Sequence, residues 1–125
     1  NNINITLKFN IMKNLFITTL LLLTTFISKA QEQFEGVWAK EGSVYETIIM
    51  ASEYAVMDVF NYSFESDKVI KETILFQSKT TLVTKLYNPS NGYSVKMEYT
   101  IKDEETLHCN ITGHLNKKIT LTKIN

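Results

Sequence analysis

The stretch Tyr93-Ser-Val-Lys-Met-Glu-Tyr-Thr-Ile101 alternates apolar and polar side chains without interruption. Successive side chains of a strand point to opposite faces, so this alternation predicts a β-strand with one buried face and one wet face. The polar run 102–105 (Lys-Asp-Glu-Glu) follows directly and predicts a hairpin turn. The apolar face of the strand takes Tyr93, Val95, Met97, Tyr99 and Ile101.

The same period of two extends from this strand in both directions. The segment Asn88-Pro-Ser-Asn-Gly92 before it is a strong turn signal, because Pro fixes φ and Asn-Gly tolerates positive φ. A helix is the alternative over Thr47–Asp58. Seven further strands are expected, at Phe34–Lys40, Val44–Met50, Tyr54–Tyr62, Val69–Gln77, Thr80–Tyr87, Thr106–Thr112 and Leu115–Ile124.

The short turns between these strands decide how the strands pair. Neighbours must be antiparallel, because a parallel crossover needs a dozen residues or more. An apolar sheet face must curl or find a partner, and closure removes both sheet edges. We therefore expect an all-β fold, a small antiparallel up-and-down β-barrel of about eight strands, with a two-sheet sandwich as the alternative.

Residues 12–30 predict a signal helix that precedes the barrel. Lys13 supplies a positive charge, Leu15–Ile27 an apolar run, and Ser28-Lys-Ala30 the small residues of a cleavage site. The run is shorter than the roughly 20 residues that span a bilayer, so we expect cleavage after Ala30 and no stable membrane span, with an uncleaved anchor as the alternative. Residues 1–11 are interpreted as an upstream extension and residues 31–125 as a domain that is secreted or periplasmic.

Charge and cysteine usage exclude several classes. All 13 basic residues are Lys, and residues 31–125 hold ten of them against thirteen acids, a net charge of −3. A mildly acidic chain without Arg does not suit a phosphate backbone, so no nucleic-acid partner is expected. The lone Cys109 cannot form an internal disulfide and is expected to be a buried thiol, with an intermolecular disulfide as the alternative.

The opening Phe34-Glu-Gly-Val-Trp38 resembles the Phe-x-Gly-x-Trp start of lipocalins and fatty-acid-binding proteins, the calycin group. A late run, Tyr99-x-Ile-x-Asp-x-x-x-Leu107, is similar to small lipocalin-like secreted bacterial proteins. The resemblance implies that Gly36 lets the chain cross the barrel base closely and that Trp38 plugs it. It also implies a cation packed on the Trp; the family uses Arg, and here Lys123 is the candidate, with a solvated Lys123 as the alternative.

The resemblance implies a small hydrophobic or amphipathic ligand held in the barrel. The large inward candidates that would line its site are Trp38, Phe60, Phe76, Met97 and Tyr99. The alternative is that these side chains fill the interior, because a barrel of eight short strands is just wide enough for its own side chains. The protein would then act through its outer face on another envelope protein. The oligomeric state is not predicted.

Chemistry-bearing residues are few, and no catalytic residue, metal site or cofactor is expected. His108 and Cys109 would point to opposite faces of one strand, so His108 and His114 are interpreted as surface histidines rather than metal ligands. No Gly-x-Ser-x-Gly motif occurs, so an enzyme is not expected. Asp58 shares a strand face with Val56, Phe60 and Tyr62; we expect a bulge to turn it toward water, with an inward ligand anchor as the alternative.

Overall fold

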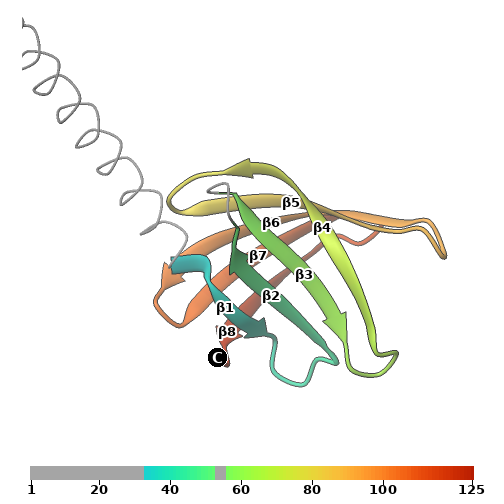
Figure 1. Cartoon of the computed structure of the whole chain (residues 1–125), viewed down its shortest axis with the longest axis horizontal. Coiled ribbons are helices and arrows are strands. Elements are labelled where there is room, and N and C mark those ends of the chain that lie inside the picture. The colour runs from blue at the N-terminus through green and yellow to red at the C-terminus, as the bar shows by residue number, and fades with distance from the viewer. Residues whose placement is uncertain (1–32, 53–55) are drawn as a thin grey trace, which may run out of the picture.

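Eight antiparallel strands follow one another around a closed barrel in the computed structural model, which describes residues 33–52 and 56–125 (Figure 1). Each strand pairs with the next, and β8 closes the ring by pairing with β1. The predicted up-and-down barrel is confirmed, and the sandwich and the helix over Thr47–Asp58 are wrong. The strands are β1 Gly36–Ala39, β2 Tyr45–Ala51, β3 Met57–Ser63, β4 Lys68–Gln77, β5 Thr81–Asn88, β6 Tyr93–Asp103, β7 Thr106–Gly113 and β8 Lys117–Lys123.

The predicted signal helix, its cleavage site and the upstream extension, residues 1–30, lie outside the described residues. Across residues 33–52 and 56–125 there is no helix of the length and apolar character needed to cross a membrane.

The alternation in β5, β6 and β7 is confirmed residue by residue. Val95, Met97 and Tyr99 of β6 are buried. Tyr99 lies opposite Cys109 in the β6–β7 ladder, so the two strands turn the same face inward. Cross-strand neighbours on one face pack together, and the inward faces of these strands therefore form a continuous core. His108 is exposed while Cys109 is a buried free thiol, as expected.

Strand β3 turns the opposite face inward from the one predicted. Met57 and Val59 are buried, whereas Phe60 is only half-buried and lies on the outer face with Asp58. The prediction followed the large apolar Phe60 and Tyr62, although the charged Asp58 lies on the same face and Met57 and Val59 make the other face apolar. The pairing of Val59 with buried Ile49 of β2 decides the orientation. Asp58 is therefore directed outward without a bulge, and its carboxylate lies 3.3 Å from the Lys71 amine.

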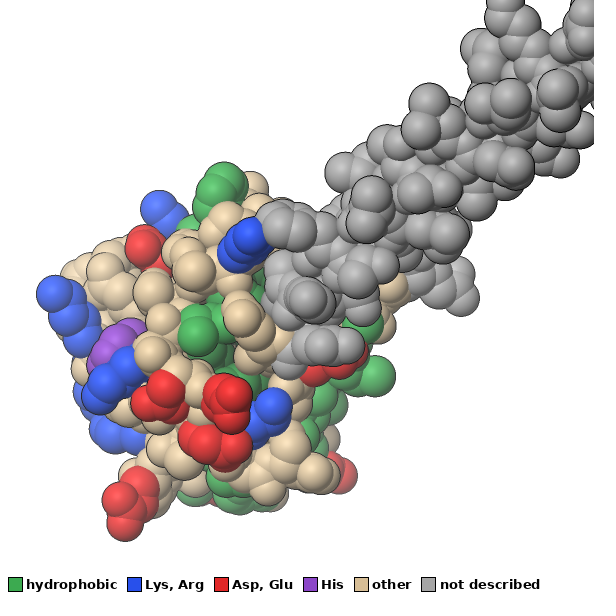
Figure 2. Space-filling model, turned by 90° about the vertical axis from the view of Figure 1, so that its left-hand side faces the viewer, with side chains coloured by type: hydrophobic (Ala, Val, Ile, Leu, Met, Phe, Trp, Pro, Cys, Tyr) green, Lys and Arg blue, Asp and Glu red, His purple; other side chains and the backbone are tan. Residues whose placement is uncertain are grey.

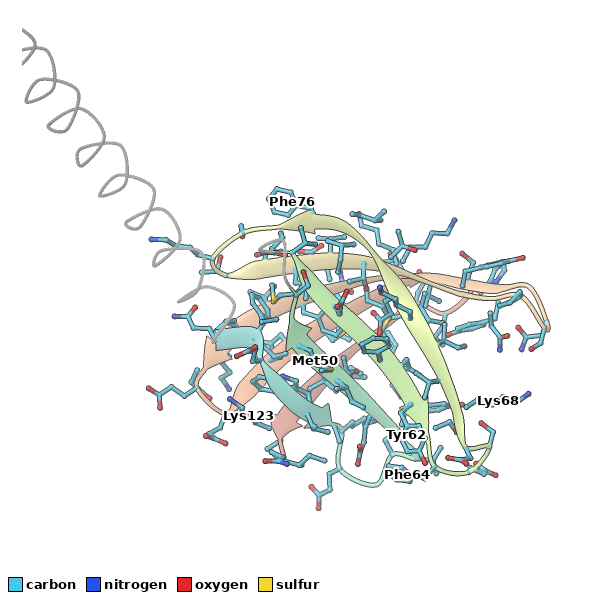
Figure 3. The ribbon with its side chains drawn as sticks, in the orientation of Figure 1. Met50, Tyr62, Phe64, Lys68, Phe76 and Lys123 are labelled. Carbon is cyan, nitrogen blue, oxygen red and sulfur yellow. The ribbon has the colours of Figure 1, made fainter. Side chains whose placement is uncertain are left out.

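The prediction that Phe76 points inward is also wrong. Ile74 pairs with Thr84 and Phe76 with Val83, which leaves Leu75 as an extra residue in β4. A bulge of this kind shifts every later side chain to the other face. Phe76 is consequently 54% exposed and points away from the barrel in Figure 3.

Trp38 closes the end of the barrel at which the described chain begins. Its side chain is fully buried, and its indole N–H donates to the Phe34 carbonyl oxygen at 2.8 Å. Lys123 lies opposite Trp38 in the β1–β8 ladder, with its amine 5.5 Å from the ring centroid, so the predicted cation–π pair is confirmed. Figure 2 views this end, where side chains of both charges lie around hydrophobic ones.

Candidate functional site

A cavity of about 590 Å³ opens at the other end of the barrel. Hairpins β1–β2, β5–β6 and β7–β8 contribute to its mouth, and in Figure 1 the β1–β2 and β5–β6 hairpins lie at the end away from the grey N-terminal trace. The volume is within the range of small-molecule sites, roughly 300–1,000 Å³. The deeper lining is mostly apolar, with Thr47 and Asn61 as polar members; its apolar residues include Ile70, Leu86, Val95, Met97, Ile111 and Leu121.

The rim of the cavity is polar. Tyr45 and Tyr93 lie there with amide side chains of the β5–β6 turn and with Lys40 and Lys117. Contact with the Lys117 amine and repulsion between the two positive charges lower the pKa of Lys40. A wet rim above an apolar interior is the arrangement that holds a molecule with an apolar body.

A buried polar layer lies deeper in the barrel. Glu72 of β4 is 1% exposed, and its Oε1 accepts hydrogen bonds from the Thr84 hydroxyl at 2.5 Å and the Tyr99 hydroxyl at 2.7 Å. Its Oε2 atom is buried and has no hydrogen-bond partner among the described residues. Sequence reasoning missed this carboxylate, although a signal was present: Glu72 stands between Ile70 and Ile74 on the apolar face of its strand.

Burial raises the pKa of Glu72, and the hydrogen bonds from Thr84 and Tyr99 oppose that rise by favouring the carboxylate. Burial and the Glu72 charge also raise the pKa of Tyr99 well above its usual value and that of Cys109 to about 12. Both groups are therefore neutral at ordinary pH. A thiol held this far from ionisation is not a nucleophile.

We expect the free energy of unfolding to fall as pH rises above about 4.5, the ordinary pKa of Glu72. Because the folded pKa is raised, the unfolded chain loses its Glu72 proton first and binds fewer protons; stability therefore declines until the folded pKa is passed. Each unit of the rise costs about 1.4 kcal/mol. Urea denaturation across a pH series should show this decline in the natural chain relative to Glu72→Gln, which has no proton to lose. Parallel profiles would contradict it.

The structure gathers only part of the predicted ligand site. Met97 lines the cavity, and Tyr99 lies two residues deeper on the same face. Trp38 is inward-facing but closes the far end and is not part of the cavity lining. Phe60 and Phe76 lie on the outside, for the reasons given above.

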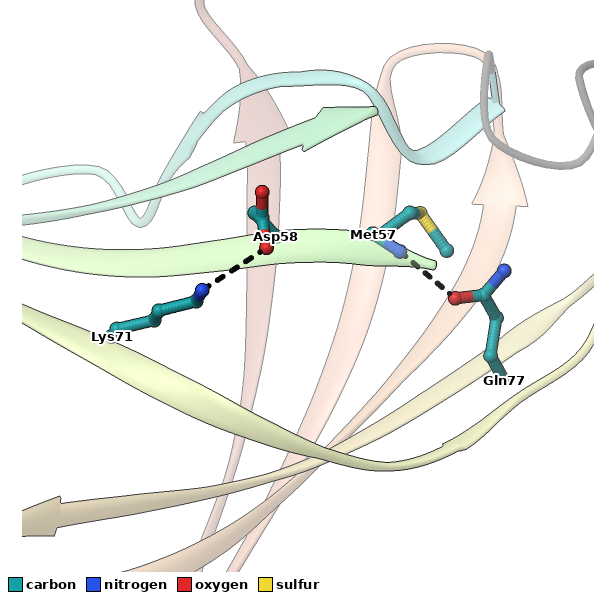
Figure 4. A network of polar contacts seen from close by, with 4 residues as sticks. All are labelled: Met57, Asp58, Lys71 and Gln77. Carbon is teal, nitrogen blue, oxygen red and sulfur yellow. Dashed lines mark hydrogen bonds and ion pairs between the residues drawn. The ribbon is translucent and has the colours of Figure 1, made fainter. Parts of the chain in front are cut away.

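A second hollow, about 350 Å³, lies in the wall between β3 and β4. Backbone pairing between these strands ends at Val59 and Glu72, and beyond that point the strands separate (Figure 4). Two side-chain contacts bridge the gap: the Asp58–Lys71 ion pair and a hydrogen bond of 3.2 Å from the Met57 amide to the Gln77 side-chain oxygen. Glu72 borders this hollow, whereas the larger cavity is lined on β4 by Ile70, two residues before it.

The histidine and acidic residues of the described chain do not gather into a second site. Within residues 33–52 and 56–125 no three His, Cys, Asp or Glu side chains come close enough to hold a metal ion. His114 is exposed, and its Nδ1 atom accepts a hydrogen bond of 3.0 Å from the Ser94 amide.

Comparison with known proteins gives no match: no protein-family model, curated protein or solved structure is similar to this chain.

Proposed function

We propose that this protein is an exported lipocalin-like barrel that holds a small hydrophobic or amphipathic molecule in its cavity. The observation that carries the proposal is the cavity of about 590 Å³, apolar in its depth and polar at its rim. Its place of action would be outside the cell or in the periplasm, as the leader in residues 12–30 suggests.

The division of the barrel into a packed end and an open end supports this proposal. Trp38, Phe34 and Leu107 are fully buried at or near the closed end. The cavity opens at the opposite end, where Leu115 and Tyr45 are exposed. An eight-stranded barrel has room for its side chains or for one small ligand, and here the side chains leave one end unfilled.

Filling the cavity should abolish binding. Ile70 lines the cavity, so Ile70→Trp places a large ring inside it. Val69 is the next residue of β4 and is 58% exposed on the outer face, which makes Val69→Trp the matched control. The probe is Nile red, a neutral dye that brightens in apolar surroundings. We expect the natural chain and Val69→Trp to bind it equally and Ile70→Trp to bind at least tenfold more weakly.

Two results would end the proposal: no brightening with the natural chain, or equal binding by Ile70→Trp in a fold with unchanged circular dichroism.

A second candidate function is favoured by the exposed apolar side chains of the outer face. Met50, Val69 and Phe76 are each more than half exposed, as a barrel that contacts another envelope protein through its wall would require. If both tryptophan variants still bind Nile red, the dye does not occupy the cavity, and the outer face becomes the better supported site of function.

A further inference from the structure

The Glu72 carboxylate lies one layer below the cavity. The polar layer consists of Glu72, Thr84 and Tyr99, on three neighbouring strands. On each strand, a residue that lines the cavity lies two positions away on the same inward face. The lining residue and its deeper neighbour are Ile70 and Glu72 on β4, Leu86 and Thr84 on β5, and Met97 and Tyr99 on β6.

Contacts connect the cavity floor to this layer. Thr47 lines the cavity and shares a hydrogen bond with the buried Tyr99 hydroxyl. Met97 also lines the cavity and lies directly opposite Thr84 in the β5–β6 ladder, and Thr84 donates to Glu72. A methionine side chain is unbranched and adapts its shape easily, so the cavity wall next to Thr84 is formed by a movable group.

The Oε2 atom of Glu72 needs a donor that the described residues do not provide. Its partner atom Oε1 already accepts two hydrogen bonds. Buried polar atoms in proteins almost always have a partner, so Oε2 calls for a donor from outside the described residues, either a water or a bound molecule.

We infer that the molecule held in the cavity is amphipathic with an amine or hydroxyl on its inner end, and that Oε2 of Glu72 accepts a hydrogen bond from that group. The inference rests on the proposed function, because it describes what occupies the same cavity. It assigns the selectivity of the site to a buried carboxylate rather than to the rim.

Charge supports an amine over an acid at this depth. An ammonium group would supply the opposite charge that a buried carboxylate lacks, whereas a ligand carboxylate would meet a like charge. Inside the barrel, the titratable groups that interact with Glu72 are Tyr99 and Cys109, and both are held neutral by burial. On the side of the β3–β4 hollow, Asp58 and Lys71 lie near Glu72 but form an ion pair with each other. The lysines at the rim, Lys40 and Lys117, are exposed to water, so an anionic group would remain with them at the mouth.

The test compares dodecylamine, dodecanol and dodecanoic acid as competitors of Nile red, below their micelle concentrations, on the full chain. We expect dodecylamine to compete at least tenfold more strongly than dodecanoic acid, with dodecanol between them. In Glu72→Gln an amide N–H₂ replaces the free oxygen, so the preference for the amine should vanish or reverse. Glu98→Gln, on the outer face of β6, is the matched control and should keep the preference.

The outcomes separate this inference from the proposed function. If Nile red binds and Ile70→Trp prevents it, but dodecanoic acid competes as well as dodecylamine, the cavity is a ligand site and the role of Glu72 is wrong. The same holds if Glu72→Gln keeps the amine preference or if Glu98→Gln loses it. If Nile red does not bind the natural chain at all, the proposed function fails as well.

Discussion

Replacing Trp38 by alanine is expected to lower the free energy of unfolding by about 3–5 kcal/mol, the usual cost of removing a large buried aromatic side chain. Trp38 is fully buried, donates a hydrogen bond to the Phe34 carbonyl and lies under the Lys123 amine. All three contributions disappear together, and the closed end of the barrel is left with a void. A domain of this size has roughly 5–15 kcal/mol of stability, so the variant loses a large share of it.

Urea denaturation followed by far-ultraviolet circular dichroism measures this effect without relying on the fluorescence that the substitution removes. Trp38→Phe keeps an aromatic ring but loses the indole N–H, so we expect a smaller loss and a folded protein. Met50→Ala is the surface control, because Met50 is 52% exposed; its change should stay within about 0.5 kcal/mol. A loss below about 1 kcal/mol for Trp38→Ala would show that Trp38 does not hold the closed end together.

The fold was predictable because most strands carry one apolar and one polar face. In β6 and β7 the alternation is strict, and burial in the structure follows it. The misplacement of Phe60 and Phe76 has two separate causes. At the start of β3 the large Phe60 shares a face with the charged Asp58, and the pairing of Val59 with Ile49 of β2 selects the face that is buried. In β4 a bulge at Leu75 reverses the phase, and no residue type in the strand predicts it.

The candidate site was less predictable than the fold. A cavity is a volume that the packed side chains leave empty, so it depends on how all the strands close together rather than on any one motif. The buried carboxylate is different, since Glu72 interrupts an apolar face between Ile70 and Ile74. An acid in phase with a core face points to a polar group inside the fold, but its partners Thr84 and Tyr99 are twelve and twenty-seven residues away in the chain.

Replacing Gly36 by alanine is expected to destabilise the barrel by more than the roughly 1–3 kcal/mol that an unfavourable backbone conformation costs. Gly36 has a φ of +143°, which side-chain-bearing residues rarely adopt. A Cβ atom there would lie 2.7 Å from the Asn125 carbonyl oxygen and 2.7 Å from the Lys123 Cε atom. The chain end can give way only by breaking the hydrogen bond of 2.7 Å from the Val37 amide to Asn125, which joins the last residue to β1.

Gly42→Ala separates the two contributions. Gly42 also has a positive φ, +77°, but nothing lies within 4 Å of its Cβ position. Gly42→Ala should therefore lose only the free energy of the unfavourable backbone conformation, about 1–2 kcal/mol. The midpoint of urea denaturation should fall further for Gly36→Ala than for Gly42→Ala, and Lys123 should lose its contact with Trp38, visible as a change in tryptophan emission. Equal midpoints would mean that the close approach of β1 to the chain end contributes nothing to the closed end of the barrel.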